Sequence, residues 1–169
     1  MLRRACRRGS SGPEKVLLGT AAVKVIGRSP CKVLVVPRAA RITISKILVA
    51  TDGSEHARTA AVEAIEITKR SGSRLIAVSV AESEIKKGNA LAHVDAVMAS
   101  AQKVGLSGEA LTAVGKTHEI IIETAKRTAA GVIVMGAYGK TRIKRFLMGS
   151  TTETVIGLKS CAVLVAKTS

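Results

Sequence analysis

The stretch Val132-Ile133-Val134-Met135-Gly136-Ala137-Tyr138-Gly139, followed after nine residues by Gly149-Ser150-Thr151, decides the fold. Four apolar residues that end at a glycine are typical of a buried strand leading into a turn. Glycine leaves the backbone open to close approach, and a Gly-Ser-Thr sequence that begins a new segment offers N–H donors and hydroxyls. This combination favours a phosphate-binding loop in an α/β nucleotide-binding protein.

Short apolar runs without polar alternation recur along the chain, as expected of strands that are buried on both faces. Helical patterns separate them, the first capped by Ser54 and stopped at Gly72, and the third capped by Thr117. The alternation predicts a doubly wound, five-stranded parallel α/β sheet, Rossmann-like with strand order 3-2-1-4-5 and helices on both faces. The expected strands are 47–50, 75–80, 110–114, 132–135 and 162–165, and the expected helices are 55–70, 90–104, 118–130 and 149–159.

Composition limits the functional classes that fit this fold. Of 169 residues, 47% are apolar and 1% aromatic, so Val, Ile, Leu and Ala must fill the core and base stacking on aromatic side chains is disfavoured. The net charge of +15 is uneven: residues 1–41 hold ten Lys and Arg against one Glu, a net +9, and residues 42–169 hold 17 basic and 11 acidic side chains, a net +6. An interaction with nucleic acid or an anionic surface is therefore weighed chiefly for the N-terminal segment.

An internal repeat explains that segment. Shifting the sequence by 130 residues makes nine of the 22 positions from 17 to 38 identical, without a gap. The shift places Cys31 on Cys161 and Val33-Leu34-Val35 on Val163-Leu164-Val165. Residues 1–41 are therefore interpreted as a helix-strand appendage, the truncated remnant of a preceding copy, and residues 42–169 as one complete domain.

The remnant cannot bury its apolar faces alone, so it is expected to dock on the domain or on a second chain. An edge strand, with its unpaired N–H and C=O groups, is the natural place. We therefore expect residues 33–36 to pair beside the closing strand at 163–165. The remnant has Cys6 where the domain has Gly136, and Arg3-Arg4 where a strand should be, so it is expected to bind nothing.

The spacing of Gly136, Gly139 and Gly149-Ser150, together with the run Lys46-Ile47-Leu48-Val49-Ala50-Thr51-Asp52-Gly53-Ser54, resembles the universal stress protein family over about residues 44–167. The resemblance implies a five-stranded α/β fold, homodimers or tandem pairs, and ATP binding with little or no catalysis. Any magnesium would be carried by the nucleotide. A homodimer or an internal pseudo-dimer through the closing strands is the assembly that the resemblance implies.

The resemblance also implies the ligand contacts. Adenine and ribose would meet Ala50, Thr51, Asp52 and Val80, and the phosphates and ribose would meet Met135, Gly136, Gly139, Gly149, Ser150 and Thr151. An aspartate at a strand end can accept from a ribose hydroxyl, and the start of the helix at Ser150 offers N–H groups to phosphate. Lys140 and Arg142 would add charge to the triphosphate, or are solvated loop cations.

Two features leave alternatives open. Asp52 is either a ribose ligand or a helix-capping residue beside Ser54. Ala130-Gly131 stands where the family usually has an acidic residue before the fourth strand, which puts the local helix-to-strand geometry in question.

Other chemistry has little support in the sequence. Cys31 and Cys161 are interpreted as small buried residues rather than redox sensors, and His56, His93 and His118 have no metal-ligand spacing, with His56 and His118 expected in exposed first turns of helices. The sequence contains no recognisable nucleophile motif, P-loop or magnesium-binding motif of the kind that an efficient ATPase needs. Three cysteines without a disulfide pattern, and the lack of a membrane-length apolar run, favour a cytoplasmic protein.

The sequence thus predicts an ATP-binding regulatory stress protein. Two alternatives stay open: a nucleotide-free module that binds a partner through its basic N-terminal segment, and a very slow ATPase.

Overall fold

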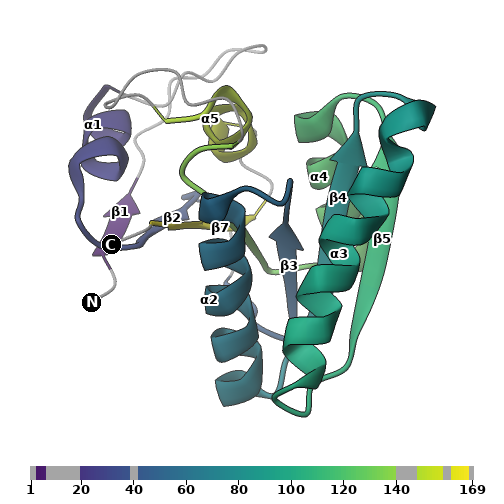
Figure 1. Cartoon of the computed structure of the whole chain (residues 1–169). Coiled ribbons are helices and arrows are strands. Elements are labelled where there is room, and N and C mark those ends of the chain that lie inside the picture. The colour runs from purple at the N-terminus through teal and green to yellow at the C-terminus, as the bar shows by residue number, and fades with distance from the viewer. Residues whose placement is uncertain (1–2, 7–19, 39–41, 140–147, 158–160, 168–169) are drawn as a thin grey trace.

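A computed structural model describes residues 3–6, 20–38, 42–139, 148–157 and 161–167. Helices cover both faces of one sheet (Figure 1). The strands are β1 (Arg3–Cys6), β2 (Val33–Val36), β3 (Lys46–Ala50), β4 (Arg74–Ala81), β5 (Gly108–Val114), β6 (Val132–Gly136) and β7 (Ala162–Ala166). The helices are α1 (Thr20–Arg28), α2 (Glu55–Ser71), the 3-10 helix η1 (Glu84–Lys86), α3 (Lys87–Gln102), α4 (Thr117–Thr128) and α5 (Ser150–Gly157).

The sheet has seven strands in the order β1-β2-β7-β6-β3-β4-β5. The five strands from β3 to β7 are mutually parallel and stand in the predicted order 3-2-1-4-5. The strand count differs from five because β2 and β1 extend the sheet beyond β7. The predicted pairing of residues 33–36 with the closing strand is confirmed, since β2 runs antiparallel to β7 with Leu34 opposite Leu164.

Residues 3–6 correct one expectation. The arginines at 3 and 4 argued against a strand there, yet β1 pairs in parallel with β2, with Arg3 opposite Val33 and Cys6 opposite Val36. β1 is the edge strand of the sheet, and β2 is its one neighbour among the described strands. Long-range pairing with β2 therefore outweighs the low local preference for a strand.

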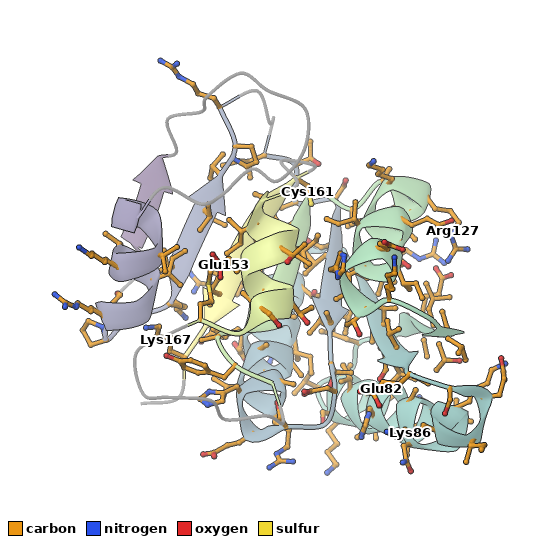
Figure 2. All side chains as sticks on the ribbon, turned by 90° about the horizontal axis from the view of Figure 1, so that it is seen from above. Glu82, Lys86, Arg127, Glu153, Cys161 and Lys167 are labelled. Atoms are coloured by element: carbon orange, nitrogen blue, oxygen red, sulfur yellow. The ribbon has the colours of Figure 1, made fainter. Side chains whose placement is uncertain are left out.

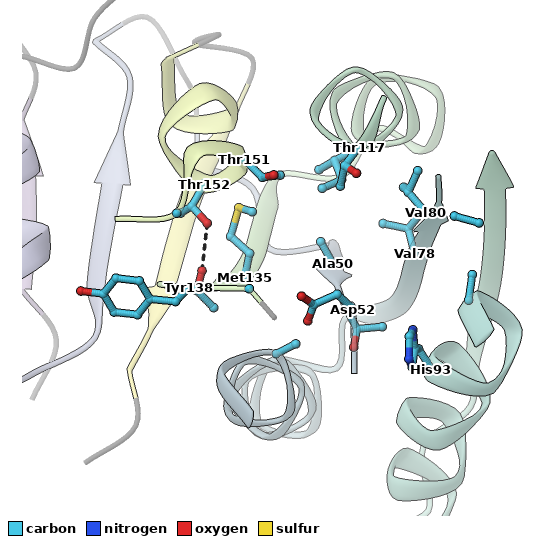
Figure 3. A pocket seen from close by; sticks show the side chains of 18 of the residues that line it. Ala50, Asp52, Val78, Val80, His93, Thr117, Met135, Tyr138, Thr151 and Thr152 are labelled. Atoms are coloured by element: carbon cyan, nitrogen blue, oxygen red, sulfur yellow. Dashed lines mark hydrogen bonds between the residues drawn. The ribbon is translucent and has the colours of Figure 1, made fainter. Parts of the chain in front are cut away.

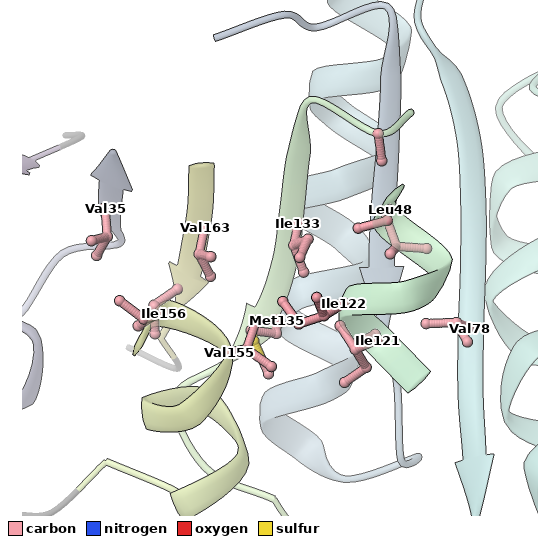
Figure 4. Packing of buried hydrophobic residues seen from close by; sticks show 14 of the residues in the cluster. Val35, Leu48, Val78, Ile121, Ile122, Ile133, Met135, Val155, Ile156 and Val163 are labelled. Carbon is pink, nitrogen blue, oxygen red and sulfur yellow. The ribbon is translucent and has the colours of Figure 1, made fainter. Parts of the chain in front are cut away.

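Two apolar layers hold the sheet. One lies under α1, α4 and α5, where Leu48, Ile76 and Ile133 are at most 1% exposed, and the other lies under α2 and α3 (Figure 4 shows part of the first layer). Because side chains alternate between the faces of a strand, successive residues of β3 enter opposite layers: Ile47 and Val49 face α2, while Leu48 faces α4. Both layers consist almost wholly of aliphatic side chains, as the composition predicts.

The helix ends match the predicted signals in part. Ser54 caps α2 by accepting a hydrogen bond from Ala57 N at 3.2 Å, and Gly72 ends this helix with φ 66°. Thr117 was expected to cap the third long helix, but it is the first residue of α4, and Lys116 is the N-cap without a side-chain hydrogen bond. This helix ends at Ala129, which adopts a left-handed φ of 53°.

Gly131 stands at the point where the sequence departs from the family pattern, and the structure gives it a packing role. Its N–H donates to Lys46 O at 3.1 Å, and a Cβ placed there would lie 1.9 Å from Thr43 O. The chain segment before β3 passes so close that only glycine fits.

Candidate functional site

A pocket of about 540 Å³ lies at the carboxyl ends of β3, β4 and β6. The helices that follow β3 and β6 pack on opposite faces of the sheet, since α2 covers one layer and α5 the other. Ligand sites in doubly wound sheets occur at such a switch point. All ten residues that the resemblance assigned to contacts with adenine, ribose or phosphate line this pocket: Ala50, Thr51, Asp52, Val80, Met135, Gly136, Gly139, Gly149, Ser150 and Thr151. Lys140 and Arg142 lie outside the described residues.

The turn after β3 carries the carboxylate of the pocket. Asp52 Oδ1 accepts a hydrogen bond from Ser54 N at 3.0 Å, and Thr51 Oγ1 accepts from Gly53 N at 3.2 Å. Figure 3 shows the Asp52 side chain in the pocket, between Ala50 and His93. Ser54, rather than Asp52, is the N-cap of α2. Asp52 therefore orders the turn, and the same turn holds its carboxylate at the pocket.

Gly136 is required by packing within the protein itself. A Cβ at this position would lie 2.8 Å from the C, Cβ and O atoms of His56, so the end of β6 touches the first turn of α2. A Cβ added at Gly139 would lie 2.9 Å from Asp52 Oδ2. Gly149 differs, because a Cβ there would meet its nearest neighbours at 3.5 Å, an ordinary contact. Of these three glycines, Gly149 is the one whose absent side chain the protein's own packing does not explain.

His56 does not line the pocket but packs against two residues that do, Tyr138 and Gly136, which the sequence did not reveal. It was expected in an exposed first turn, but it is only 9% exposed, and its ring lies 5.1 Å from that of Tyr138 with a 58° tilt between the planes. The contact joins the start of α2 to the segment Gly136–Gly139 that follows β6. A pattern of residues along α2 cannot show it, because the partner lies more than 80 residues away in the sequence.

The first turn of α5 closes the pocket on the side of β6. Thr152 Oγ1 donates to Gly136 O at 3.0 Å (Figure 3). Gly149 N donates to Ala137 O at 2.9 Å. Ser150 and Thr151 belong to this first turn, and the first N–H groups of a helix have no partner within the helix. They carry the positive end of the helix dipole, which suits an anionic group.

The opposite side of the pocket is largely apolar and comes from β4, α3 and α4. Val78 and Val80 line it from β4, and Ile121 and Thr117 from α4. His93 lies on α3, with Nδ1 3.4 Å from Ser79 Oγ. The rim carries an exposed ion pair between Glu82 and Lys86, 2.5 Å apart (Figure 2). Only Val80 among these residues was predicted from the sequence, because neither β4 nor the helices α3 and α4 carry a recognisable motif.

The remaining groups with possible chemical roles are the thiol of Cys161 and side chains that could bind a metal ion. Cys161 is half-buried, and burial raises the pKa of its thiol from 9.0 to about 11, against the opposing effect of a backbone hydrogen bond at Ile133. A thiol with so high a pKa is a poor nucleophile, in keeping with its interpretation as a small packed residue. Among the described residues, no three His, Cys, Asp or Glu side chains gather in a group that could hold a metal ion.

The fold and the pocket define the class: a doubly wound α/β protein with a ligand-sized cavity at its switch point. The chain belongs to the universal stress protein family, whose model matches residues 43–167. It is 32% identical over 138 residues to universal stress protein MJ0531 of Methanocaldococcus jannaschii, covering 72% of this chain and 81% of the relative. To Slr1230 of Synechocystis it is 31% identical over 153 residues, which cover 87% of this chain and 50% of the relative.

Solved structures agree with this assignment. A universal stress protein from Archaeoglobus fulgidus has a TM-score of 0.81 and 25% identity, and the match covers 98% of this chain but 62% of that one. A universal stress protein in complex with cAMP has a TM-score of 0.59 and 25% identity, covering 74% of this chain and 98% of that one. The chain thus spans only part of some longer relatives. None of the helices in the described part of the chain has the length and apolarity needed to cross a bilayer.

Proposed function

We propose that this chain is a cytoplasmic, regulatory universal stress protein that binds ATP in the pocket between β3, β4 and β6, with little or no hydrolysis. The observation that carries the proposal is the convergence of three separated segments, 50–52, 135–139 and 149–151, on one pocket. Its volume of about 540 Å³ falls in the range of small-molecule sites. A relative of known structure binds cAMP, which supports an adenine nucleotide as the ligand class.

Each part of a nucleotide has a suitable surface in this pocket. The apolar side at Val78, Val80 and Ile121 suits a base, and the Asp52 carboxylate can accept hydrogen bonds from ribose hydroxyls. The first turn of α5 provides N–H groups and hydroxyls for phosphate. The protein's own packing does not require Gly149 to lack a side chain, and this lack lets an anion approach the backbone at the start of α5.

The alternative of a free basic N-terminal arm receives less support. Where the structure describes it, residues 3–6 and 20–38, this segment forms β1, α1 and β2 and is integrated in the sheet. Part of its charge is also used internally, because Lys32 Nζ lies 2.5 Å from Glu63 Oε2 of α2. A nucleotide role for the main domain is therefore the better supported function.

The proposal is tested by calorimetric titration of the whole chain with ATP and, in parallel, with cAMP. We expect saturable ATP binding with one site per chain. Absence of saturation at millimolar ATP would refute it, and binding of cAMP alone would retain the nucleotide class but reject the triphosphate. Phosphate release measured in the same samples should stay close to the rate without protein.

Asp52→Asn is the sharpest variant. The amide keeps an oxygen that can accept from Ser54 N, so the turn is retained, while the charge that would bind the ribose is lost. Losing one charge-assisted hydrogen bond, worth about 1.5–3 kcal/mol, corresponds to roughly 10-fold to 150-fold weaker ATP binding. Asp95→Asn is the matched control, because Asp95 is exposed on α3 and does not line the pocket, and its affinity should be unchanged. Equal affinities of the two variants would place the nucleotide elsewhere.

A further inference from the structure

Four segments meet at the rim of the sheet that lies opposite the pocket, where β3, β4, β5 and β6 begin. In Figure 1 this is the rim from which the arrows of β3 and β4 point away. The segments are 42–46, which leads into β3, and 69–74, 103–108 and 126–131, which connect α2, α3 and α4 to the strands that follow them. Arg74 N donates to Ser45 O at 2.9 Å, and Gly131 N donates to Lys46 O at 3.1 Å, so the first segment lies against two of the others. We call these four segments the basic rim.

The basic rim carries charge of one sign. Its four segments contain seven Lys and Arg residues and no Asp or Glu. Six of these cations are exposed: Lys69, Arg70, Arg74, Lys103, Lys126 and Arg127. None of the six forms an ion pair with a carboxylate of the described residues, although Glu66, Glu109 and Glu123 border three of the segments in the sequence. A solvated surface normally has both signs interspersed, so this segregation calls for a reason.

The helix dipole accounts for part of this charge. The basic residues in the last turns of α2 and α4 stand where cations are favoured. Arg74 has no such role, because it begins β4. It lies beside Lys46 on the neighbouring strand β3, and two like charges on adjacent strands repel. Lys46 Nζ donates to Thr128 O at 2.9 Å, whereas the Arg74 guanidinium has no hydrogen-bond partner among the described residues.

Large aliphatic side chains are exposed among these cations. Ile42, Ile44 and Val104 are 43%, 49% and 38% exposed. Ser73 Oγ donates to Ile44 O, which places this isoleucine against the turn that carries Arg74. Aliphatic side chains flanked by lysine and arginine are the composition of a surface that lies in the headgroup region of a membrane.

We propose that the basic rim binds the surface of a membrane that contains anionic lipids. Its cations would contact the lipid headgroups, and Ile42, Ile44 and Val104 would enter the boundary between headgroups and acyl chains. The pocket opens at the opposite rim, so it would face away from the membrane and stay accessible to a nucleotide. The proposal does not depend on which ligand the pocket takes.

A soluble polyanion fits the basic rim less well. The helices meet this rim with their ends rather than their sides, so none is placed to enter the major groove of DNA. No residue of the four segments is aromatic, which leaves no platform for stacked bases. A purely acidic peptide would satisfy the cations but not the aliphatic side chains. An anionic membrane satisfies both.

Sedimentation of the whole chain with lipid vesicles tests the proposal. We expect binding to phosphatidylcholine vesicles that contain about 30% phosphatidylserine, and none to vesicles of phosphatidylcholine alone. Binding should weaken as salt is raised from about 0.1 M to 1 M, because the Debye length falls from about 10 Å to 3 Å. Absence of binding to the anionic vesicles at low salt would overturn the proposal, as would equal binding to both kinds of vesicle.

The variant Arg74→Gln/Arg127→Gln locates the binding surface. Each basic residue close to an anionic membrane strengthens binding about five-fold, so the loss of two should weaken vesicle binding roughly 30-fold. Lys24→Gln/Lys116→Gln is the matched control, because it removes the same charge from exposed positions on α1 and before α4, away from the basic rim. Circular dichroism should show that both variants fold. Equal losses of binding would mean that net charge rather than the basic rim is responsible.

The aliphatic side chains separate a membrane from a soluble polyanion. Ile42→Asn/Ile44→Asn keeps every charge, so it should weaken binding to anionic vesicles about ten-fold and leave binding to a DNA duplex or to polyglutamate unchanged. Val62→Asn is the control, because Val62 is 59% exposed on α2 away from the basic rim, and its vesicle binding should not change. The proposal fails if the isoleucine variant binds vesicles as the wild type does. It also fails if DNA or polyglutamate binds more tightly than the anionic vesicles.

Discussion

Gly136→Ala should destabilise the protein without any ligand being present. The added Cβ would lie 2.8 Å from three atoms of His56, two of them in the backbone. Carbon atoms at rest stay about 3.5–4.0 Å apart, so the end of β6 and the start of α2 must separate by roughly 0.7 Å. Both elements are buried in the core on either side of this contact, which limits the relaxation available.

The cost of such overpacking is about 1–3 kcal/mol. For a chain of this size, each kcal/mol lowers the melting temperature by about 2–4 °C, so a fall of roughly 2–12 °C is expected. Urea unfolding followed by circular dichroism, with no nucleotide added, measures the free energy directly. A Gly136→Ala variant within about 0.5 kcal/mol of the wild type would refute the packing interpretation.

Gly149→Ala is the matched substitution in the same pocket. Its Cβ would meet the nearest atoms at 3.5 Å, so its stability should change by less than about 0.5 kcal/mol. If phosphate approaches the backbone at Gly149, this variant should nevertheless bind ATP more weakly. The two substitutions in one motif are thus expected to have different effects: Gly136→Ala lowers the stability of the fold, and Gly149→Ala weakens ATP binding.

Further predictions concern three positions away from the pocket. Thr68→Val should raise the free energy of unfolding by about 1 kcal/mol in urea titration, because the buried Thr68 hydroxyl has no hydrogen-bond partner among the described residues; an unchanged or lower stability would contradict this. Ala129→Gly should raise the melting temperature through a gain of about 0.5–1 kcal/mol, since Ala129 is held at φ 53° where glycine is unstrained; a lower melting temperature would show that the unfolded chain gains more from glycine than the cap does. Cys161, with its pKa raised to about 11, should react with iodoacetamide at pH 8 about 100-fold more slowly than an unperturbed thiol, as followed by peptide mapping. Because the folded-state pKa is the higher one, the stability linked to this thiol is present below pH 9 and is lost as the pH rises from 9 to 11, a loss that Cys161→Ala should remove.

The sequence predicted those features that local pattern or internal comparison can reveal. The five domain strands follow from aliphatic runs, and the pairing of β2 with β7 followed from the repeated Val-Leu-Val. Ser54 was recognisable as a cap because its hydroxyl acts on its own helix. The residues of the pocket that the sequence identified lie in the last residues of strands, in the turns that follow them and at the start of α5.

What the sequence did not show depends on contacts between distant segments. The burial of His56 depends on Tyr138, and the requirement for glycine at 136 depends on where α2 crosses β6. β1 forms although arginines are poor strand residues, because β2 offers it a partner. Thr117 resembles a cap but lies one residue too late, since the helix already begins there after Lys116.

The antiparallel contact between β2 and β7 reverses the direction of the sheet. The carboxyl ends of β3, β4 and β6 point to the rim that holds the pocket, whereas β1 and β2 end at the opposite rim. In any molecule with two full copies joined in this way, the two pockets would open on opposite sides. A partner that contacts both pockets would then have to span the molecule, and a partner that binds at a single rim would contact one pocket alone.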